Sequence, residues 1–311
     1  MMTKQKKLWV TGANGMVGQA ILRKCSNDKK YKVLTTTRND FNQINQLNTL
    51  KWLEKNKPDI VIMTSALVGG IQLNSKLPAD FLYQNSMINL NIINAANEVG
   101  CKKIIFLGAS CMYPKNAKQP LEEKSIMQGE IEETNEGYGI AKIVGLKMIQ
   151  MLNQQFKSKH LTIIPAASYG PNDCYDLSKN HVIPALMKKI HSAKIKKKNE
   201  VVLWGTGNVK REFIHVDDMV DGIFHIIKNY KNTEPINLGS GEEVTIKKLS
   251  RIISNIISYK GKISFDDSRP DGVKRKILDN KKIKKLCWKP KIMLEKGISD
   301  LYNNSIKNNL L

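Results

Sequence analysis

Three glycines near the start of the chain constrain its fold more than any other feature. They lie three residues apart at Gly12, Gly15 and Gly18, between an apolar segment at 7–10 and a helical pattern at 17–25. In a strand–turn–helix unit the first glycine permits a tight turn, the second lets the backbone approach a pyrophosphate, and the third lets helix and strand pack closely. The free N–H groups of the helix N-terminus attract the same anion. We therefore predict a dinucleotide-binding unit at the start of the chain.

Strand and helix patterns then alternate through the first half of the chain. We expect strands at 31–36, 58–63 and 103–107, and helices at 50–57 and 81–99. This alternation predicts an α/β fold with a doubly wound parallel sheet of the Rossmann type, which binds its ligands at the carboxyl ends of the strands.

No linker or repeat separates two units in the second half. That the two units interleave in sequence is implied by the family that the motifs below resemble. Residues 1–165, completed by roughly 213–240, should form the nucleotide-binding domain. Residues 166–212 and 241–311 should form a smaller α/β substrate-binding lobe. Within this half we expect a single strand at 162–167, a strand at 201–204, and helices at 181–192, 219–228 and 246–258.

The residue after the second strand bears on the choice of cofactor. Arg38 is the first charged residue there, and Asp40 follows it. At this position an acidic residue selects a free ribose 2′-hydroxyl, whereas an arginine accommodates a 2′-phosphate. We therefore predict NADP rather than NAD, and the alternative for Arg38 is a surface residue without a ligand. Small residues at 64–66 would let the cofactor lie across the next strand end.

Tyr138 and Lys142 are four residues apart in a helical segment, so their side chains share one face. An ammonium near a phenol favours the phenolate and lowers the phenol pKa, which would make Tyr138 a usable general acid. Such pairs also arise by chance on amphipathic helices. Tyr138 can act as a general acid in a reduction only if the glycine unit binds a cofactor that donates a hydride.

Composition excludes several classes of protein. A formal net charge of +22 suggests nucleic acid, but lysines are spread along the chain and aromatic residues make up only 6%. We favour compositional bias, with the positive surface attracting a diphosphate-bearing substrate. The odd number of cysteines, five, without a C-x-x-C pair argues against disulfides and structural zinc, and no apolar run reaches about 18 residues. We expect a cytoplasmic protein without a metal, a membrane span or a nucleic-acid partner.

Short motifs in a fixed order extend this interpretation to most of the chain. They are Gly12-x-x-Gly15-x-x-Gly18, Ser110-Cys-Met-Tyr-Pro114, Tyr138-Gly-Ile-Ala-Lys142, Tyr169-Gly-Pro171, His181-Val-Ile-Pro-Ala-Leu186, Trp204-Gly-Thr-Gly207, Arg211-Glu-Phe213, Val216-Asp-Asp218, Pro270-Asp-Gly272 and Arg275-Lys276. In this order the chain resembles the GDP-L-fucose synthase family of extended short-chain dehydrogenase/reductases. The resemblance implies a GDP-linked 4-keto-6-deoxy sugar as substrate, reduced at C4 with NADPH.

The resemblance also implies proton exchange at the two carbons that flank the ketone. Cys111 and His181 stand at the positions of the cysteine and histidine that epimerise C3 and C5 in that family. A ketone acidifies the neighbouring C–H bonds, and inversion needs a base on one face and an acid on the other. Without the resemblance, a lone cysteine is more often an inert core residue.

Binding residues follow from the same resemblance. Those implied for the cofactor are Gly12, Asn14, Gly15, Met16, Val17, Gly18, Arg38, Ala66, Lys142 and His181. Those implied for the substrate are Ser110, Lys189, Trp204, Arg211 and Arg275. Trp204 could equally be a packed aromatic residue at a strand end. Family members commonly dimerise through helices of the nucleotide domain, so we expect a homodimer.

Three departures from the family lie near the substrate. Ala109 replaces a serine that hydrogen-bonds the reacting carbonyl, and Ser110, as its neighbour on a strand, would point to the other face. Ala166-Ala-Ser168 replaces a run that contains an asparagine, and Lys189 replaces an arginine. A pocket enlarged by two alanines would suit a heptose.

Several alternatives stay open at this point. Cys111 and His181 could have lost epimerisation, which would leave a reductase acting on an already epimerised GDP-4-keto-heptose. In a different class, the chain could be a non-catalytic NADP-binding sensor or a basic nucleic-acid binder.

Overall fold

The strands of the first half form one six-stranded parallel sheet. Its order is β2, β1, β3, β4, β5, β9. The strands are β1 (Lys6–Thr11), β2 (Tyr31–Thr35), β3 (Ile60–Met63), β4 (Lys103–Leu107), β5 (Leu161–Pro165) and β9 (Ile236–Leu238). The predicted doubly wound sheet is confirmed. The computed structural model describes residues 5–176, 181–269 and 271–311, so Pro270 of the Pro270–Gly272 motif lies outside the described residues.

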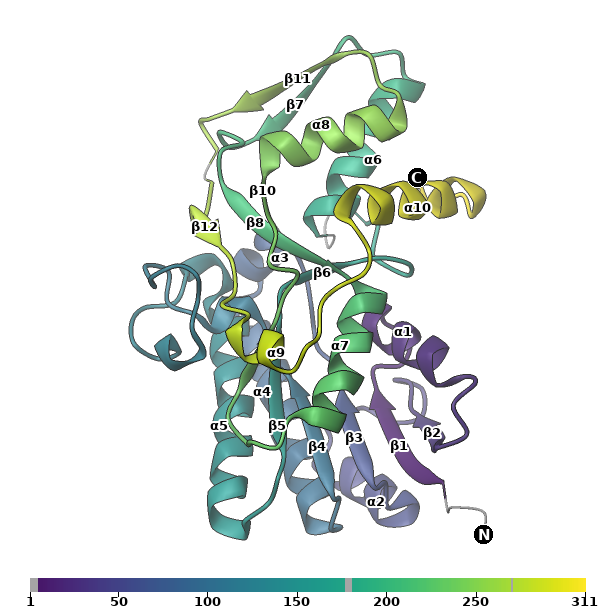
Figure 1. Ribbon diagram of the computed structural model, residues 1–311, viewed down its shortest axis with the longest axis vertical. Helices are drawn as coiled ribbons and strands as arrows, with labels where there is room; N and C mark the ends of the chain where they lie inside the picture. Colours follow the sequence, from purple (N-terminus) through teal and green to yellow (C-terminus); the bar gives the residue numbers. More distant parts are fainter. Residues whose placement is uncertain (1–4, 177–180, 270) are drawn as a thin grey trace.

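Helices cover both faces of this sheet, because alternate residues of a strand point to opposite sides. Leu8 and Val10 of β1 belong to the apolar core shared with α1 (Met16–Cys25) and α7 (Val216–Asn229). Trp9 belongs to the other core, shared with α2 (Gln46–Asn56), α4 (Pro78–Glu98) and α5 (Glu136–Phe156). Figure 1 shows α1 beside α7 and α4 beside α5, and each pair packs together.

The upper region of Figure 1 contains two small sheets with their own apolar core. In the first, β8 (Lys210–His215) pairs with β6 (Ala167–Tyr169), β10 (Glu243–Thr245) and β12 (Arg275–Lys276). The second joins β7 (Glu200–Trp204) and β11 (Lys262–Asp266) in parallel. The helices here are α6 (Val182–Ile195), α8 (Ile246–Ile257) and α10 (Leu294–Lys307). Most of these elements lie within residues 166–212 and 241–311, which were predicted to form the substrate-binding lobe.

Short elements connect these parts. They are α3 (Ile71–Lys76), α9 (Lys281–Lys285) and three single turns of 3-10 helix, η1 (Ser110–Met112), η2 (Glu123–Ser125) and η3 (Glu133–Asn135). Among the described residues, no helix combines the length and the apolar character needed to cross a membrane.

The strand predicted at 162–167 is wrong as a single element. It is two strands in two sheets, because β5 ends at Pro165, which has no N–H for a ladder, and β6 then pairs with β8. Ala166 is buried in the core beneath the main sheet, with 5% of its surface exposed. The proposal of a pocket enlarged by two alanines therefore does not hold for Ala166.

The predicted boundary between the two units also shifts near the C-terminus. Leu278, Ile283 and Trp288 were assigned to the lobe, yet they pack into the core beneath α1 and α7. The segment after β12 thus returns to the nucleotide-binding sheet and ties the two regions together.

His160 makes the stability of the main sheet sensitive to acid. Its ring is 2% exposed, its Nδ1 accepts the Ile104 N–H at 3.2 Å, and burial lowers its pKa to about 4. Below the ordinary pKa of about 6.5 the unfolded chain binds a proton that the folded chain does not. The free energy of unfolding therefore decreases as the pH is lowered. We expect this group to remove about 2 kcal/mol of stability between pH 7 and pH 5.

Urea unfolding at several pH values would test this expectation. Asn in place of His160 keeps an acceptor for Ile104 but does not titrate. The His160→Asn protein should therefore show a shallower fall of stability between pH 7 and pH 5 than the wild type. Equal slopes in the two proteins would contradict the assignment.

Candidate active site

The glycine turn has the geometry of an anion site. Gly12 adopts φ +60°, and a Cβ there would lie 2.7 Å from the Ser65 backbone. A Cβ at Gly18 would lie 2.5 Å from Gly12 O, so helix and turn pack closely. At Gly15, by contrast, a Cβ would meet only Gly12 O at 3.4 Å, so this side of the turn is open.

The N-terminus of α1 faces this open side. Gly15 is its N-cap and makes no side-chain cap hydrogen bond, so the first N–H groups remain for an anion. Asn14 and Gly15 are exposed, whereas Met16 and Val17 pack partly against the core. These residues fit a dinucleotide pyrophosphate.

The neighbouring strand end is held in place by side chains. Thr11 Oγ1 accepts the N–H groups of Thr64 at 3.0 Å and Ser65 at 3.1 Å, which joins the ends of β1 and β3. Asn85 of α4 bonds both the N–H and the carbonyl of Leu67, at 2.8 and 3.1 Å. Ala66 lies between these two clamps, half-buried, at the edge where the cofactor was predicted.

Of the two charged residues after β2, Asp40 is hydrogen-bonded within its own loop, whereas Arg38 is exposed to solvent. The Asp40 carboxylate accepts the N–H and hydroxyl of Thr37 at 2.6 and 2.9 Å, and these bonds hold its pKa below its usual value. Arg38 is exposed beside it. Because the acidic residue is turned into its own loop, this strand end fits a 2′-phosphate better than a free 2′-hydroxyl.

Lys142 reaches from α5 to the carboxyl end of β4. Its ammonium donates to Leu107 O at 2.8 Å and lies 5.6 Å from the centre of the Tyr138 ring. The side chain is buried, and burial lowers its pKa to about 8, opposed by the charge of Cys111. Tyr138 and Lys142 therefore meet at the sheet edge, as their spacing predicted.

The pKa of Tyr138 moves in the direction opposite to the prediction. Burial raises it above its ordinary value, and the neighbouring Cys111 raises it further. The Lys142 ammonium does not offset this, because it is directed at the Leu107 carbonyl. A raised pKa nevertheless keeps the phenol protonated near neutral pH, which is the form that a general acid needs.

Cys111 lies directly against α5, the helix that carries Tyr138 and Lys142. A Cβ at Gly139 would come within 2.8 Å of Cys111 O, so only a glycine between Tyr138 and Lys142 lets the turn pack this closely. The thiol is buried, which raises its pKa, while the charges of Lys276 and Lys142 oppose the rise.

Ala109 and Ser110 are not consecutive strand residues. β4 ends at Leu107, and Ser110 to Met112 form a 3-10 turn. Contrary to the prediction, Ser110 need not point away from Ala109, because strand alternation does not apply in a turn.

Lys276 occupies the place that the sequence analysis gave to Arg275. In β12 the two side chains point to opposite faces, and Arg275 Nε pairs with Glu243 Oε2 at 2.6 Å. Lys276 pairs in register with Arg211 of β8, and burial lowers its pKa while Cys111 raises it. Arg211 is anchored by Val273 O at 2.7 Å. Two cations thus face the site beside Cys111.

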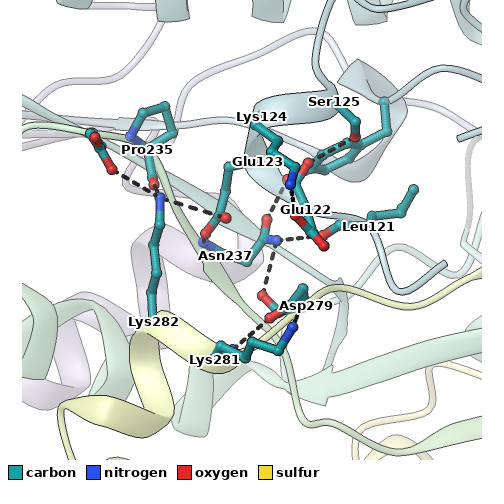
Figure 2. Close-up of polar contacts among 12 residues, drawn as sticks. Leu121, Glu122, Glu123, Lys124, Ser125, Pro235, Asn237, Asp279, Lys281 and Lys282 are labelled. Atoms are coloured by element: carbon teal, nitrogen blue, oxygen red, sulfur yellow. Dashed lines mark hydrogen bonds and ion pairs between the residues drawn. The ribbon is translucent and has the colours of Figure 1, made fainter. Parts of the chain in front are cut away.

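A buried polar network holds these segments together. The Glu212 carboxylate accepts the N–H groups of Leu278 at 2.8 Å and Gly241 at 2.7 Å, which holds the segment after β12 and the turn before β10 against β8. Figure 2 shows Asn237 at the centre of the adjoining contacts, where its amide donates to Leu121 O at 2.8 Å and Asp279 O at 3.1 Å.

The same amide reaches the cysteine turn. Asn237 Oδ1 accepts the hydroxyl of Tyr113, two residues after Cys111. Glu123 accepts the Asn237 N–H at 2.9 Å and pairs with Lys282 at 3.6 Å, as Figure 2 shows. Asn237, which is buried, therefore helps to position both the 3-10 turn that contains Cys111 and the segment that follows Lys276.

Trp204 carries a second cluster of cations. Lys189 Nζ and Arg269 Cζ each lie 5.3 Å from the centre of the indole ring, which is half exposed. The alternative of a packed aromatic residue is therefore wrong. An exposed ring with two cations fits a nucleobase and a phosphate group.

His181 is the N-cap of α6, and its side chain is 46% exposed. Its Nδ1 lies 3.3 Å from Asp173 Oδ1. Among the described residues, no hydrogen bond or ion pair joins it to Cys111 or Tyr138. No group of three metal-binding side chains occurs in the described parts of the chain.

Comparison with known proteins agrees with this arrangement. Residues 8–239 match the NAD dependent epimerase/dehydratase family. The chain is 41% identical to a GDP-L-fucose synthase from Sinorhizobium fredii over 97% of this chain and 96% of the relative. It superposes on a GDP-6-OMe-4-keto-L-xylo-heptose reductase from C. jejuni with a TM-score of 0.93 and 31% identity, over 99% of both chains.

A second solved structure contains a cofactor. It is a GDP-mannoheptose C4 reductase from Campylobacter jejuni with NADP bound, with a TM-score of 0.88 and 32% identity over 97% of this chain and 99% of the other. The chain therefore belongs to the NAD dependent epimerase/dehydratase family, and its membership of the GDP-L-fucose synthase family within it is confirmed.

Proposed function

We propose that this protein is an NADP-dependent reductase that reduces C4 of a GDP-linked 4-keto sugar. The observation that carries the proposal is the meeting of Tyr138 and Lys142 at the carboxyl end of β4, on the edge where β1 ends in the glycine turn. The relatives named above are synthases and reductases of GDP-sugars, which supports the substrate class.

Residues of the first unit would hold the cofactor. The open turn at Gly15 and the N-terminus of α1 would take the pyrophosphate, and Arg38 would take the 2′-phosphate. Lys142 would hold the nicotinamide ribose. NADPH supplies the hydride that reduces the ketone.

The substrate would lie between Tyr138 and the cations of the lobe. Arg211 and Lys276 would neutralise the diphosphate, and Trp204 with Lys189 would contact the nucleotide. The Tyr138 phenol would donate its proton to the C4 oxygen, and its raised pKa keeps that proton in place until the oxygen becomes basic.

Epimerisation would use Cys111 and His181. A base removes a proton beside the ketone from one face, and an acid returns one to the other face. Burial raises the pKa of the Cys111 thiol and so keeps a proton on the sulfur, although the charges of Lys276 and Lys142 oppose the rise. The competing candidate is a reductase that receives an already epimerised GDP-4-keto-heptose. The heptose reductases among the similar structures favour it.

Replacing Ala109 by serine tests the effect of the missing hydroxyl. A serine would add a hydrogen-bond donor to the C4 oxygen. In other enzymes, removing one donor to a developing oxyanion lowers the rate by about 10²- to 10³-fold. We expect Ala109→Ser to raise turnover at least about tenfold with a GDP-4-keto-6-deoxyhexose. Steady-state NADPH oxidation measures this. Unchanged or lower turnover would show that another donor, such as Ser110 or a water molecule, already fills this role.

A substrate screen tests the proposed function itself. NADPH oxidation should occur with GDP-4-keto hexoses or heptoses, and the preferred compound identifies the sugar. A salt-dependent DNA and RNA binding assay runs beside it. No oxidation with any of these sugars, together with tight sequence-tolerant nucleic-acid binding, would contradict the enzyme assignment.

We also propose a cytoplasmic homodimer that supplies a sugar for a capsule or another surface polysaccharide. Tyr83 of α4 and Met151 and Phe156 of α5 leave at least half of their surface exposed, on helices that pack on each other. Light scattering should give twice the chain mass of 35.2 kDa. A monomer at micromolar concentration would contradict the dimer.

A further inference from the structure

Asp173 lies beside His181 and is buried. The Asp173 side chain is 2% exposed, against 46% for His181. Asp173 Oδ1 accepts the Cys174 N–H at 2.8 Å and lies 3.3 Å from His181 Nδ1. A carboxylate only accepts hydrogen bonds, so the ring carries a proton on Nδ1 in this contact.

The two nitrogens of His181 consequently have different surroundings. Nδ1 faces the buried carboxylate, and in the neutral ring with a proton on Nδ1 the lone pair is on Nε2. We propose that Asp173 is a positioning residue, which holds the His181 ring through Nδ1 and leaves Nε2 to exchange a proton with the carbon beside the sugar ketone.

The step that this arrangement serves is the epimerase half of the proposed function, on which the inference rests. His181 Nε2 takes the proton, the electrons of the C–H bond move into the enolate, and the ring becomes an imidazolium. The Asp173 carboxylate then faces the new positive charge. The Cys111 thiol returns a proton to the other face, which inverts the carbon.

A purely structural role does not explain a carboxylate at this position. Asp173 Oδ2 has no hydrogen-bond partner among the described residues, and leaving a buried polar atom unpaired destabilises the fold. An asparagine would accept the Cys174 N–H without a charge. The charge is explained by His181, whose pKa is raised by the Asp173 hydrogen bond against the effect of burial.

Neither of the titratable side chains near Asp173 and His181 supplies the negative charge that raises the pKa of His181. Tyr175 is the titratable neighbour of Asp173, and its phenol contacts Ser305. Lys188 donates to the Tyr175 backbone carbonyl at 2.9 Å. Asp173 is therefore the charged group that shifts the pKa of His181.

NMR of ring-labelled histidines in the substrate-free protein tests the contact. The Asp173→Asn variant keeps the side-chain volume and an acceptor, and it should lower the pKa of His181 by about one unit. Asp173→Ala should in addition move the neutral proton from Nδ1 to Nε2, which the ring nitrogen shifts report. His191 and His225 provide internal controls. An unchanged His181 pKa in Asp173→Asn would overturn the proposal.

Deuterium uptake from solvent at the carbons beside the ketone tests the consequence. Asp173→Asn should slow it by at least about tenfold relative to wild type. The matched control is Asp176→Asn, an exposed aspartate in the same loop, which should exchange at the wild-type rate. Wild-type exchange in Asp173→Asn would overturn the positioning role. No exchange in wild type would overturn the inference together with the epimerase half, whereas the NADPH oxidation screen tests the reductase separately.

Discussion

Tyr138→Phe should lower the rate of C4 reduction by about 10³-fold while leaving the affinity for NADPH within about twofold. The substitution removes the phenolic proton donor and keeps the ring. The edge-to-face contact with Phe81, with ring centres 6.3 Å apart, should therefore persist. Single-turnover reduction and NADPH titration measure the two quantities separately.

A matched control for this variant is Tyr83→Phe. Tyr83 is 60% exposed on α4, so loss of its hydroxyl should leave the rate of reduction unchanged. If Tyr138→Phe kept most of its activity, Tyr138 could not be the proton donor. If it lost NADPH affinity as severely as turnover, its role would be cofactor binding.

Lys142→Met should impair both the reaction and cofactor binding. Methionine has a similar length but no ammonium, so it can neither hold the nicotinamide ribose nor assist Tyr138. We expect turnover to fall by at least about 10²-fold and NADPH binding to weaken by about tenfold. A variant with weakened binding and normal turnover at saturating NADPH would contradict the catalytic part.

The same substitution should stabilise the protein without its ligands. In the folded state the pKa of Lys142 is about 8, below its ordinary 10.5, so at pH 7 its buried charge costs about 3 kcal/mol. Losing the bond to Leu107 O offsets about 1 kcal/mol, which leaves Lys142→Met about 2 kcal/mol more stable.

The stability difference between Lys142→Met and the wild type depends on pH, because the folded and unfolded wild-type chains release the Lys142 proton at different pH values. Below about pH 8 the lysine is charged in both states, and the folded state bears the full cost. As the pH rises from 8 toward 10.5 the folded lysine loses its proton first, so the wild type gains stability relative to the variant. Urea unfolding at pH 7 and pH 10 should show the difference shrinking. A less stable variant at pH 7 would contradict the assigned cost of burial.

Local patterns in the sequence predicted the parts of the site that lie within one element. The glycine turn follows a strand and opens a helix, and each glycine position has a steric reason that its neighbours in sequence already suggest. Tyr138 and Lys142 share a helix face because their spacing requires it. The parallel, doubly wound sheet follows from the alternation of strands and helices.

Contacts between distant segments could not be predicted in the same way. Which of Arg275 and Lys276 faces the site depends on the pairing of a two-residue strand with β8. The contact of Asp173 with His181 joins residues eight apart, and the sequence between them has no periodic pattern. Arg269 reaches Trp204 only because β11 pairs with β7, and Glu212 gave no signal beyond its place in a motif.

The pKa of Tyr138 shows a further limit. Spacing predicted the neighbouring ammonium correctly, but it did not show that burial raises the pKa of the phenol or that Lys142 donates to Leu107 O. Burial outweighs a nearby charge when that charge is directed elsewhere. Spacing therefore identified the pair, and the surroundings decide its chemistry.

The most direct test of the proposed reductase follows the hydride. NADPH carrying deuterium at the transferable position of its nicotinamide is incubated with the preferred GDP-4-keto sugar, and the product is examined by NMR and mass spectrometry. We predict one deuterium at C4 of the sugar for each NADPH oxidised, and its near absence with Tyr138→Phe. Oxidation of NADPH that leaves no deuterium at C4 of the sugar would contradict the account.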